Sequence, residues 1–220
     1  CPRKTVLIPC FHDETYIYMR IFREAYSKAA GIVYNAQPEY DLMQPIYDLE
    51  HTEQEVIGVG MDTDISYDKE RFYDKYDIRD PFIVYAGRKD EGKNIYTLIR
   101  YFEKYKERMG NHLKLVLIGG GKVEIADAIE GDVYDLGFVD RQDKYDIIAA
   151  SQLLCQPSKN ESFSIVIMES WLCGRPALVH RDCEVTKHFV QDSNGGLYFS
   201  NYMEFEGCIN YILDHPEEAK

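Results

Sequence analysis

Glu161 and Glu169 are two carboxylates eight positions apart, and they bracket an apolar run that follows the apolar strand Leu153–Gln156. Hydrophobic residues in this run recur at helical spacing, and Ser164 is a plausible cap where the helix begins. A helix N-terminus beside a strand end offers free N–H groups to an anion such as a diphosphate. Glutamates before the helix and in its second turn can accept hydrogen bonds from sugar or ribose hydroxyls. This arrangement predicts a pocket for a nucleotide sugar.

A second candidate site is the turn Gly87–Asn94, which follows the apolar strand Phe82–Ala86. Arg88 and Lys93 flank this turn, and a flexible loop there can bring both cations to one pair of phosphates. The alternative is an ordinary solvated turn, because exposed Lys and Arg are common on protein surfaces. Lys89, between them, is expected to be solvated.

The same turn also spells G-x-x-x-x-G-K from Gly87 to Lys93, the skeleton of a phosphate-binding P-loop. Two features weigh against this interpretation. Asn94 stands where a Ser or Thr hydroxyl would hold Mg²⁺, and Asp90 and Glu91 place negative charge inside a loop that would cradle phosphates. A P-loop-like NTPase is therefore the least favoured alternative.

Spacing also disfavours other enzyme classes. A glycoside hydrolase needs two carboxyl groups about 5 to 9 Å apart, whereas on one helix the backbones of Glu161 and Glu169 would be separated by about 12 Å of rise. Gly119–Gly121 lacks the G-x-G-x-x-G spacing of NAD sites and follows the second strand of its domain. The histidines show no metal-ligand spacing such as H-E-x-x-H, so we assign no metal.

The elements that must position these residues alternate from Pro81 onward. Apolar strands alternating with helices predict a doubly wound α/β fold, with a parallel sheet covered on both faces and a ligand site at the carboxyl ends of its strands. All the candidate motifs above fall at those ends. Asn201 and Glu204 form a capping-box pattern at the last helix. Strands are expected at 82–86, 113–118, 133–136, 153–156, 176–179 and 196–199, and helices at 94–108, 123–129, 141–150, 164–173 and 202–213.

The first part of the chain has the pattern of about half of such a domain. The sequence starts directly in an apolar strand, so we expect a fragment. Gly58–Asp62 break the pattern, and the residues up to 80 are charged and turn-rich. We therefore expect a partial domain at 1–57, an interdomain linker at 58–80 and a nucleotide-binding domain at 81–220. Within the first part, strands are expected at 5–10, 32–35 and 55–57, and helices at 15–30 and 39–47.

An incomplete first sheet would leave apolar side chains uncovered. We expect Val6, Ile8, Ile32 and Val33 to be exposed in this way, because further strands should cover them. Residues 1–57 would then pack loosely or be shielded by another copy of the chain, as in a homodimer.

Together these motifs resemble the GT4-like family of retaining glycosyltransferases, which have the GT-B fold of two Rossmann-like domains. The resemblance rests on the Glu-x7-Glu motif of residues 161–169 and on the basic pair Arg88 and Lys93. The segments Leu117–Gly121 and Leu136–Val139 match further strand-turn elements of the family. All four motifs stand in the family's order.

The resemblance implies a hexosyltransferase-type enzyme that moves a sugar from a UDP-, GDP- or ADP-linked donor to a hydroxyl of a glycan, lipid or small molecule, without a metal. The cations would neutralise the departing diphosphate, while Glu161 would hold the sugar and Glu169 the ribose. The family commonly has Gly where Ser164 stands. The expected catalytic residues are His12, Glu161, Arg88 and Lys93, with His12 facing the donor sugar. The expected donor-binding residues are Arg88, Lys93, Gly119, Gly120, Phe138, Val139, Glu161, Phe163, Ser164, Ile165 and Glu169.

Asn35 and Glu39 also match a family segment, and both a helix-start role and a ligand role are open for them. A non-catalytic homologue that binds nucleotide sugars is the second functional hypothesis. Residues 1–57 supply only part of the acceptor-side domain. We therefore expect this chain alone to bind the donor but to transfer no sugar.

Composition excludes several other functions. Lys and Arg total 25 against 38 Asp and Glu, and the net charge of −13 argues against a nucleic-acid or anionic-membrane surface. Hydrophobic residues make up 45%, which is enough for a packed core. Six cysteines without a C-x-x-C pair predict free thiols in a reducing cytosol. No run reaches the roughly 20 apolar residues that span a bilayer, so we expect a cytoplasmic protein with at most peripheral membrane contact.

Overall fold

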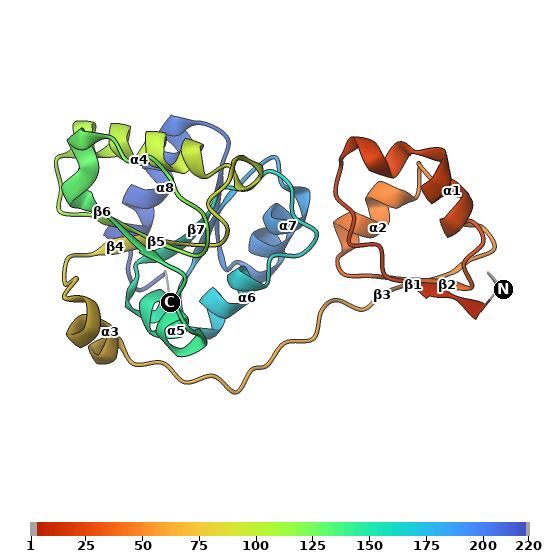
Figure 1. The fold of residues 1–220 in the computed structure, drawn as a ribbon, viewed down its shortest axis with the longest axis horizontal. Coiled ribbons are helices and arrows are strands. Elements are labelled where there is room, and N and C mark those ends of the chain that lie inside the picture. Colours follow the sequence, from red (N-terminus) through yellow and green to blue (C-terminus); the bar gives the residue numbers. More distant parts are fainter. Residues whose placement is uncertain (1–3, 219–220) are drawn as a thin grey trace.

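The computed structural model describes residues 4–218 and shows two α/β domains joined by an extended segment (Figure 1). The first domain contains a parallel sheet of order β1-β2-β3, formed by Val6–Leu7, Gly31–Tyr34 and Glu53–Val56. The second contains a six-stranded parallel sheet of order β6-β5-β4-β7-β8-β9. The predicted fold class, α/β with doubly wound parallel sheets, is confirmed.

The first predicted helix is two shorter elements. A 3₁₀ helix at Thr15–Tyr18 is followed by α1 at Arg20–Tyr26, and Met19 between them is extended, with a ψ of 139°. A continuous helix would place Ile17 and Ile21 on one face. The break turns them apart, so that Ile17 is fully buried and Ile21 is 71% exposed.

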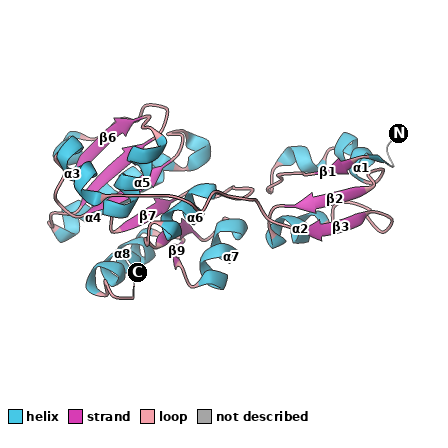
Figure 2. Ribbon diagram, turned by 90° about the horizontal axis from the view of Figure 1, so that it is seen from below, coloured by secondary structure: helices cyan, strands magenta, loops and turns pink. Residues whose placement is uncertain are grey.

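The first sheet is covered on one face only. Its covered face packs against α1 and against α2, which spans Gln37–Met43 (Figure 2). On the other face, Val6 and Ile8 are each 61% exposed and Ile57 is 69% exposed. The predicted exposure of Val6 and Ile8 is therefore confirmed, although the strand that contains them is paired only over Val6–Leu7.

The expectation for Ile32 is wrong, and that for Val33 is met in part. Ile32 is 1% exposed, because the parallel register places it beside Leu7 on the face that the helices cover. Val33 points the opposite way and is half-buried.

Helices cover both faces of the second sheet, and two separate apolar clusters fill the layers between sheet and helices. Every residue of the central strand β4 is buried. The strands are β4 Phe82–Ala86, β5 Lys114–Ile118, β6 Val133–Gly137, β7 Leu153–Gln156, β8 Ala177–His180 and β9 Gly196–Phe199. One face carries α4 (Ile95–Met109) and α8 (Tyr202–Asp214), and the other carries α3 (Lys69–Tyr76), α5 (Arg141–Ala150), α6 (Ile165–Leu172) and α7 (Glu184–Ser193).

Two helical segments differ from the prediction. Helix α7 was not expected; its N-cap residue, Cys183, makes no side-chain capping bond, so no capping signature marks its start. The short helix expected at 123–129 is a 3₁₀ helix at Asp127–Asp132. At α8, Asn201 accepts from the N–H of Glu204 as the capping box predicts, but Glu204 bonds Ser200 rather than the N–H of Asn201.

The expected linker, residues 58–80, is not turn-rich throughout. Helix α3 lies within it and begins after Asp68, whose carboxylate caps the first turn. The helix docks on α5 through Phe72, which is 1% exposed, and through two hydrogen bonds of 2.8 Å from Arg71 to Asp146. Helix α3 therefore packs as part of the second domain, and only the stretch before it connects the two domains.

Candidate functional site

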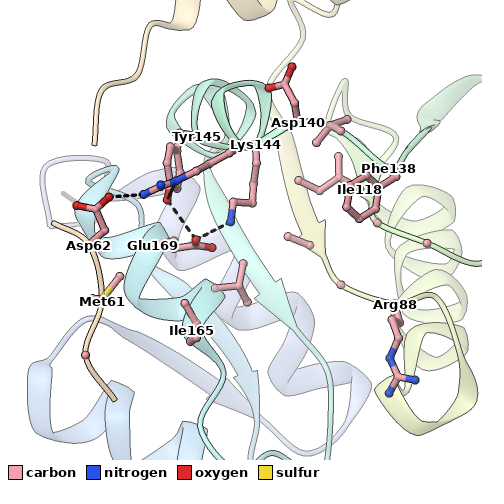
Figure 3. A pocket seen from close by; sticks show the side chains of 18 residues that line it. Met61, Asp62, Arg88, Ile118, Phe138, Asp140, Lys144, Tyr145, Ile165 and Glu169 are labelled. Carbon is pink, nitrogen blue, oxygen red and sulfur yellow. Dashed lines mark hydrogen bonds and ion pairs between the residues drawn. The ribbon is translucent and has the colours of Figure 1, made fainter. Parts of the chain in front are cut away.

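A cavity of about 690 Å³ lies in the second domain at the carboxyl ends of β4, β5 and β6 (Figure 3). Helices α5 and α6 and residues 60–62 form its other walls. Phe138, which is 89% exposed, and Val139 line it after β6, where sequence reasoning expected a nucleotide. The other expected residues in its lining are Arg88, Gly119, Gly120, Ile165 and Glu169.

The two expected cations have different partners. Arg88 lines the cavity, is 75% exposed and lies 3.4 Å from Asp90. Lys93 is turned toward the other motif, because its Nζ lies 2.7 Å from Oε1 of Glu161. The side-chain amide of Asn94 donates to the carbonyl of Pro157 at 2.9 Å, which fixes this turn beside the end of β7. The structure thus brings Lys93 to Glu161 and leaves Arg88 exposed beside the cavity, next to Asp90.

The geometry of this turn contradicts a P-loop. A P-loop cradles phosphate with backbone N–H groups and a lysine. Here the N–H of Lys93 donates to the carboxylate of Asp90 at 3.0 Å, and the ammonium of Lys93 is paired with Glu161. The carboxylate of Asp90 therefore accepts the backbone N–H group of Lys93, which a phosphate would need as a donor.

The glycine turn after β5 supports the loop that carries Arg88. The N–H of Lys89 donates to the carbonyl of Gly120 at 2.7 Å. Gly119 has a φ of +120°, and a Cβ there would lie 2.0 Å from the carbonyl oxygen of Gly87. Only glycine permits this approach. The expectation that Lys89 is solvated is wrong, because Lys89 is 3% exposed. Its ammonium group pairs with the carboxylate of Asp135, which anchors the loop to β6.

The start of α6 is strained. Ser164 is the N-cap residue but adopts a left-handed conformation with φ of 75°, and its side chain makes no capping bond, so the predicted capping role is wrong. Its hydroxyl instead accepts a 3.3 Å hydrogen bond from Gln156. A left-handed residue is a natural place for the glycine that the family commonly has here. Beside it, Phe163 packs edge-on against Phe189 of α7, with ring centroids 5.0 Å apart, while Ile165 faces the cavity.

Glu169 is held by two donors from α5. It is 8% exposed, and its Oε1 accepts from Nζ of Lys144 at 2.5 Å and from the hydroxyl of Tyr145 at 3.3 Å. Sequence reasoning placed helix α5 correctly but gave it no role in the site. The signal was the helix start directly after β6, because residues in the first turns of such a helix face the carboxyl ends of the strands.

A second cavity, of about 480 Å³, lies between the two domains and is lined by His12 and Glu161. Within the described part of the chain, only two buried side-chain polar atoms lack a hydrogen-bond partner: Nδ1 of His12 and Oε1 of Gln156. Gln156 is 4% exposed and directs its Nε2 toward Glu161 at 3.4 Å. Leaving a buried polar atom unpaired costs about 1 to 3 kcal/mol. His12 lines this cavity together with Glu161, and its Nδ1 lies 3.6 Å from Oε1 of Glu14. Gln156 contacts Glu161 from within the domain and lines neither of the two cavities.

Glu39 positions the loop that carries His12. It is 1% exposed, and its carboxylate accepts the N–H groups of Phe11 at 2.5 Å and Asn35 at 2.9 Å. Burial raises the pKa of Glu39 above its ordinary value, and these two amide bonds oppose that shift. Glu39 stands in the first turn of α2 and joins the loops after β1 and β2, so of the two roles that its sequence left open its contacts support the helix-start role.

Residues 4–218 offer little support for a metal site, a membrane-spanning helix or a reactive thiol. No group of three or more His, Cys, Asp or Glu side chains there is arranged to hold a metal ion, and the helices of this region are too short or too polar to cross a membrane. The five described cysteines are free thiols; Cys1 lies outside the described residues. Burial raises the pKa of Cys173 to about 12, so this thiol is not poised as a nucleophile.

Comparison with known sequences identifies the family. The family model described as "Glycosyl transferases group 1" matches residues 67–220, which is more than half of the chain. The chain belongs to the group 1 glycosyltransferases. This family membership, with the contacts of Asp90 and Lys93, excludes the NTPase alternative.

Individual relatives are distant. An α-D-kanosaminyltransferase of Streptomyces kanamyceticus is 24% identical over 166 residues, which cover 71% of this chain and 42% of that protein. An N-acetylgalactosaminyltransferase of Campylobacter jejuni that acts on a diphospho-undecaprenol-linked sugar is 36% identical over 104 residues, covering 44% of this chain and 27% of that protein. The glycosyltransferase chain described here thus spans less than half the length of either relative.

Solved structures confirm the GT-B fold. Anabaena HepE in complex with UDP and glucose matches with a TM-score of 0.74 and 21% identity, covering 91% of this chain and 58% of HepE. Sucrose-phosphate synthase from Thermosynechococcus elongatus matches with a TM-score of 0.76 and 18% identity, covering 90% of this chain and 53% of that one. Both matches cover most of the two domains, so the likeness extends beyond the nucleotide-binding half.

Proposed function

We propose that this glycosyltransferase binds a nucleoside-diphosphate sugar and transfers the sugar, with retention of configuration, to a hydroxyl of a glycan, lipid or small molecule. The observation that carries the proposal is the placement of the two motif glutamates. Glu161 precedes α6 and Glu169 lies in it, each lines one of the two cavities, and each has a lysine partner, Lys93 and Lys144 respectively. Carboxylates held in this way can accept hydrogen bonds from hydroxyls at both ends of a donor.

The residues divide the donor among them. Arg88, beside the cavity at the ends of β4, β5 and β6, and Lys93 would neutralise charge on the departing diphosphate. Such electrostatic stabilisation is commonly the largest catalytic effect. Glu169 would bind the ribose. Glu161 and His12 would hold the sugar, with Nδ1 of His12 meeting one of its hydroxyl groups, and Gln156 would orient Glu161. No residue in this assignment requires a metal, because the cations supply the positive charge.

UDP is the first donor nucleotide to test. It is the nucleotide in the HepE complex and also in a pneumococcal O-GlcNAc transferase complex with UDP and GlcNAc, whose TM-score to this chain is 0.67. GDP and ADP are also tested, because the side chains that line the cavity do not indicate a particular base. A nucleotide-sugar-binding protein without catalysis would use the same residues, and an assay of sugar transfer separates the two functions.

The direct test is calorimetric titration of UDP, GDP and ADP in the presence of EDTA. We expect one of them to bind without a metal, and Arg88→Ala to weaken that binding by about 1.5 to 3 kcal/mol, as for a charge-assisted hydrogen bond. Arg79→Ala is the matched control, because Arg79 is also largely exposed but precedes β4 at the opposite end of the strand. Absence of binding by all three nucleotides, or equal binding by Arg88→Ala and the native chain, would contradict the proposal.

A further inference from the structure

The segment that joins the domains also forms a wall of the 690 Å³ cavity at the ends of β4, β5 and β6, which is the proposed nucleotide cavity. Gly60, Met61 and Asp62 line it together with residues of β4, β5, α5 and α6. In Figure 3 the segment lies on the same side as Ile165 and Glu169 and faces Arg88 across the opening. Met61 is half-buried although it belongs to a stretch with no helix or strand. We call residues 60–62 the strap.

An ion pair fastens the strap to the second domain, and the residues that follow it are tied to the same helix, since Gln142 donates to the carbonyl of Ser66 at 2.8 Å. Oδ2 of Asp62 lies 2.7 Å from Nη2 of Arg141, the first residue of α5. The other oxygen, Oδ1, accepts the N–H of Asp64 at 3.0 Å, which fixes the carboxylate toward the helix. The hydrogen bond from Arg141 holds the pKa of Asp62 below its ordinary value. Asp62 is therefore ionised and engaged at neutral pH.

Arg141 extends this contact into the site. Its Nε donates to the hydroxyl of Tyr145 at 3.1 Å, and that hydroxyl donates to Oε1 of Glu169 at 3.3 Å. A continuous path of polar contacts therefore runs from the strap to the carboxylate proposed to hold the ribose, and Figure 3 shows its two ends as dashed lines. Glu169 has one further donor outside this path, Lys144.

We propose that Asp62 and Arg141 form a latch that closes the strap over a bound nucleoside diphosphate and, through Tyr145, orients Glu169. Asp62 and Arg141 act as positioning residues. The proposal rests on the proposed function for its ligand, and it adds that the connection between the domains takes part in donor binding. The strap belongs to the segment that follows β3 of the first domain. A nucleotide held under the strap therefore also restrains the segment that connects the two domains.

The test measures UDP affinity and UDP release for Asp62→Asn, Arg141→Gln and the double variant, by calorimetry and stopped-flow displacement. Each single variant should release UDP about threefold faster and bind it about threefold more weakly, within the range of an exposed ion pair. The double variant should lose no more than Arg141→Gln alone, because that variant already removes the contact to Asp62. Lys75→Gln is the matched control: it breaks a 2.5 Å pair to Asp143 that ties α3 to α5 outside the cavity, and it should leave UDP binding unchanged.

A second measurement needs no ligand and separates this proposal from the proposed function. Methyl NMR of methionine-labelled protein, with the Met61 signal assigned by Met61→Leu, should show a restrained methyl group in the native chain. Both single variants should shift this signal toward that of a solvated methionine. Failure of the native chain to bind UDP, GDP or ADP would overturn the proposed function, whereas an unchanged Met61 signal in both variants would overturn the latch. Losses that add in the double variant would also overturn it.

Discussion

The two domains use the same position in the fold, the loop after their first strand, but fix it differently. After β4, the loop with Arg88 is tied by backbone bonds to the neighbouring glycine turn and by buried Lys89 to Asp135. After β1, the N–H of Phe11 is bound by one side chain, the carboxylate of Glu39. The loop with Arg88 therefore belongs to a backbone framework, while the loop with His12 is held by side chains, namely the buried carboxylate of Glu39 and the packing of Phe11 on neighbouring aromatic rings.

The sheets that carry these loops also differ, because the second sheet is more completely covered than the first. β4 is buried along its whole length between two helix layers. β1 has two paired residues, and Val6 and Ile8 face solvent. A parallel sheet is stable when both of its faces are covered. The second domain thus meets this requirement within the described chain, and the first meets it on one face.

The two loops differ most at Gly119, and Gly119→Ala should have the largest effect on the free energy of unfolding. A left-handed alanine costs about 1 to 3 kcal/mol in strain, and forcing a Cβ against the carbonyl of Gly87 adds an overpacking cost of about 1 to 3 kcal/mol. We expect a loss of about 4 kcal/mol in unfolding free energy, followed by fluorescence of Trp171, the single tryptophan of the chain. Gly120→Ala is the control, since no atom lies within 4 Å of its added Cβ. Equal stabilities of the two variants would show that the loop is not held in this way.

The next effect compares one substitution in the two sheets. Ile83→Ala, in β4, removes a fully buried side chain and should cost about 2 to 4 kcal/mol. Ile8→Ala, beside β1, removes a side chain that is 61% exposed and should cost less than about 0.5 kcal/mol. Urea unfolding followed by hydrogen exchange in each domain measures both. A cost at Ile8 as large as that at Ile83 would mean that the open face of the first sheet is covered in solution, for instance by a second copy.

The smallest effect is the pH dependence of two buried carboxylates. Burial raises the pKa of Glu39 above its ordinary 4.5, so its contribution to stability is complete below pH 4.5 and is lost as pH rises through the raised value. Burial alone would also raise the pKa of Asp146, but the bonds and charge of Arg71, with further donors, lower it below its ordinary 3.8. Its contribution is therefore present above pH 3.8 and is lost as pH falls through the lowered value.

Unfolding of Glu39→Gln and Asp146→Asn across this pH range should separate the two domains. In Glu39→Gln, the first domain should no longer lose stability as pH rises above 4.5, and at neutral pH it should be about 1 to 3 kcal/mol less stable because two amides lose an ionised acceptor. In Asp146→Asn, the second domain should no longer lose stability below pH 3.8. The same pH profile in both variants would show that the two carboxylates are not held by different means.

The sequence determined the order and bounds of the elements most reliably in the second domain. The strands at 82–86, 153–156 and 196–199 and the helix at 141–150 were predicted with their observed bounds. A strand covered on both faces reads as a continuous apolar run, which few other structures produce. The first domain was predicted less well: its helix at 15–30 has the right apolar spacing but is broken at Met19. Hydrophobic spacing records which residues can be buried and not where a backbone changes direction.

The motif residues Arg88, Lys93, Glu161 and Glu169 were also found from sequence alone, because strand ends and helix starts are local features. Their partners were decided by the tertiary structure. Gln156, Lys144, Arg141 and Asp62 give no chemical signal in the sequence, yet their contacts lie beside or within the two cavities. Asp62 and Arg141 are 79 positions apart and meet only because the segment between the domains folds back along α5. A hydrogen bond depends on distances of a few tenths of an ångström, and only the packed structure fixes such distances between residues so far apart in the chain.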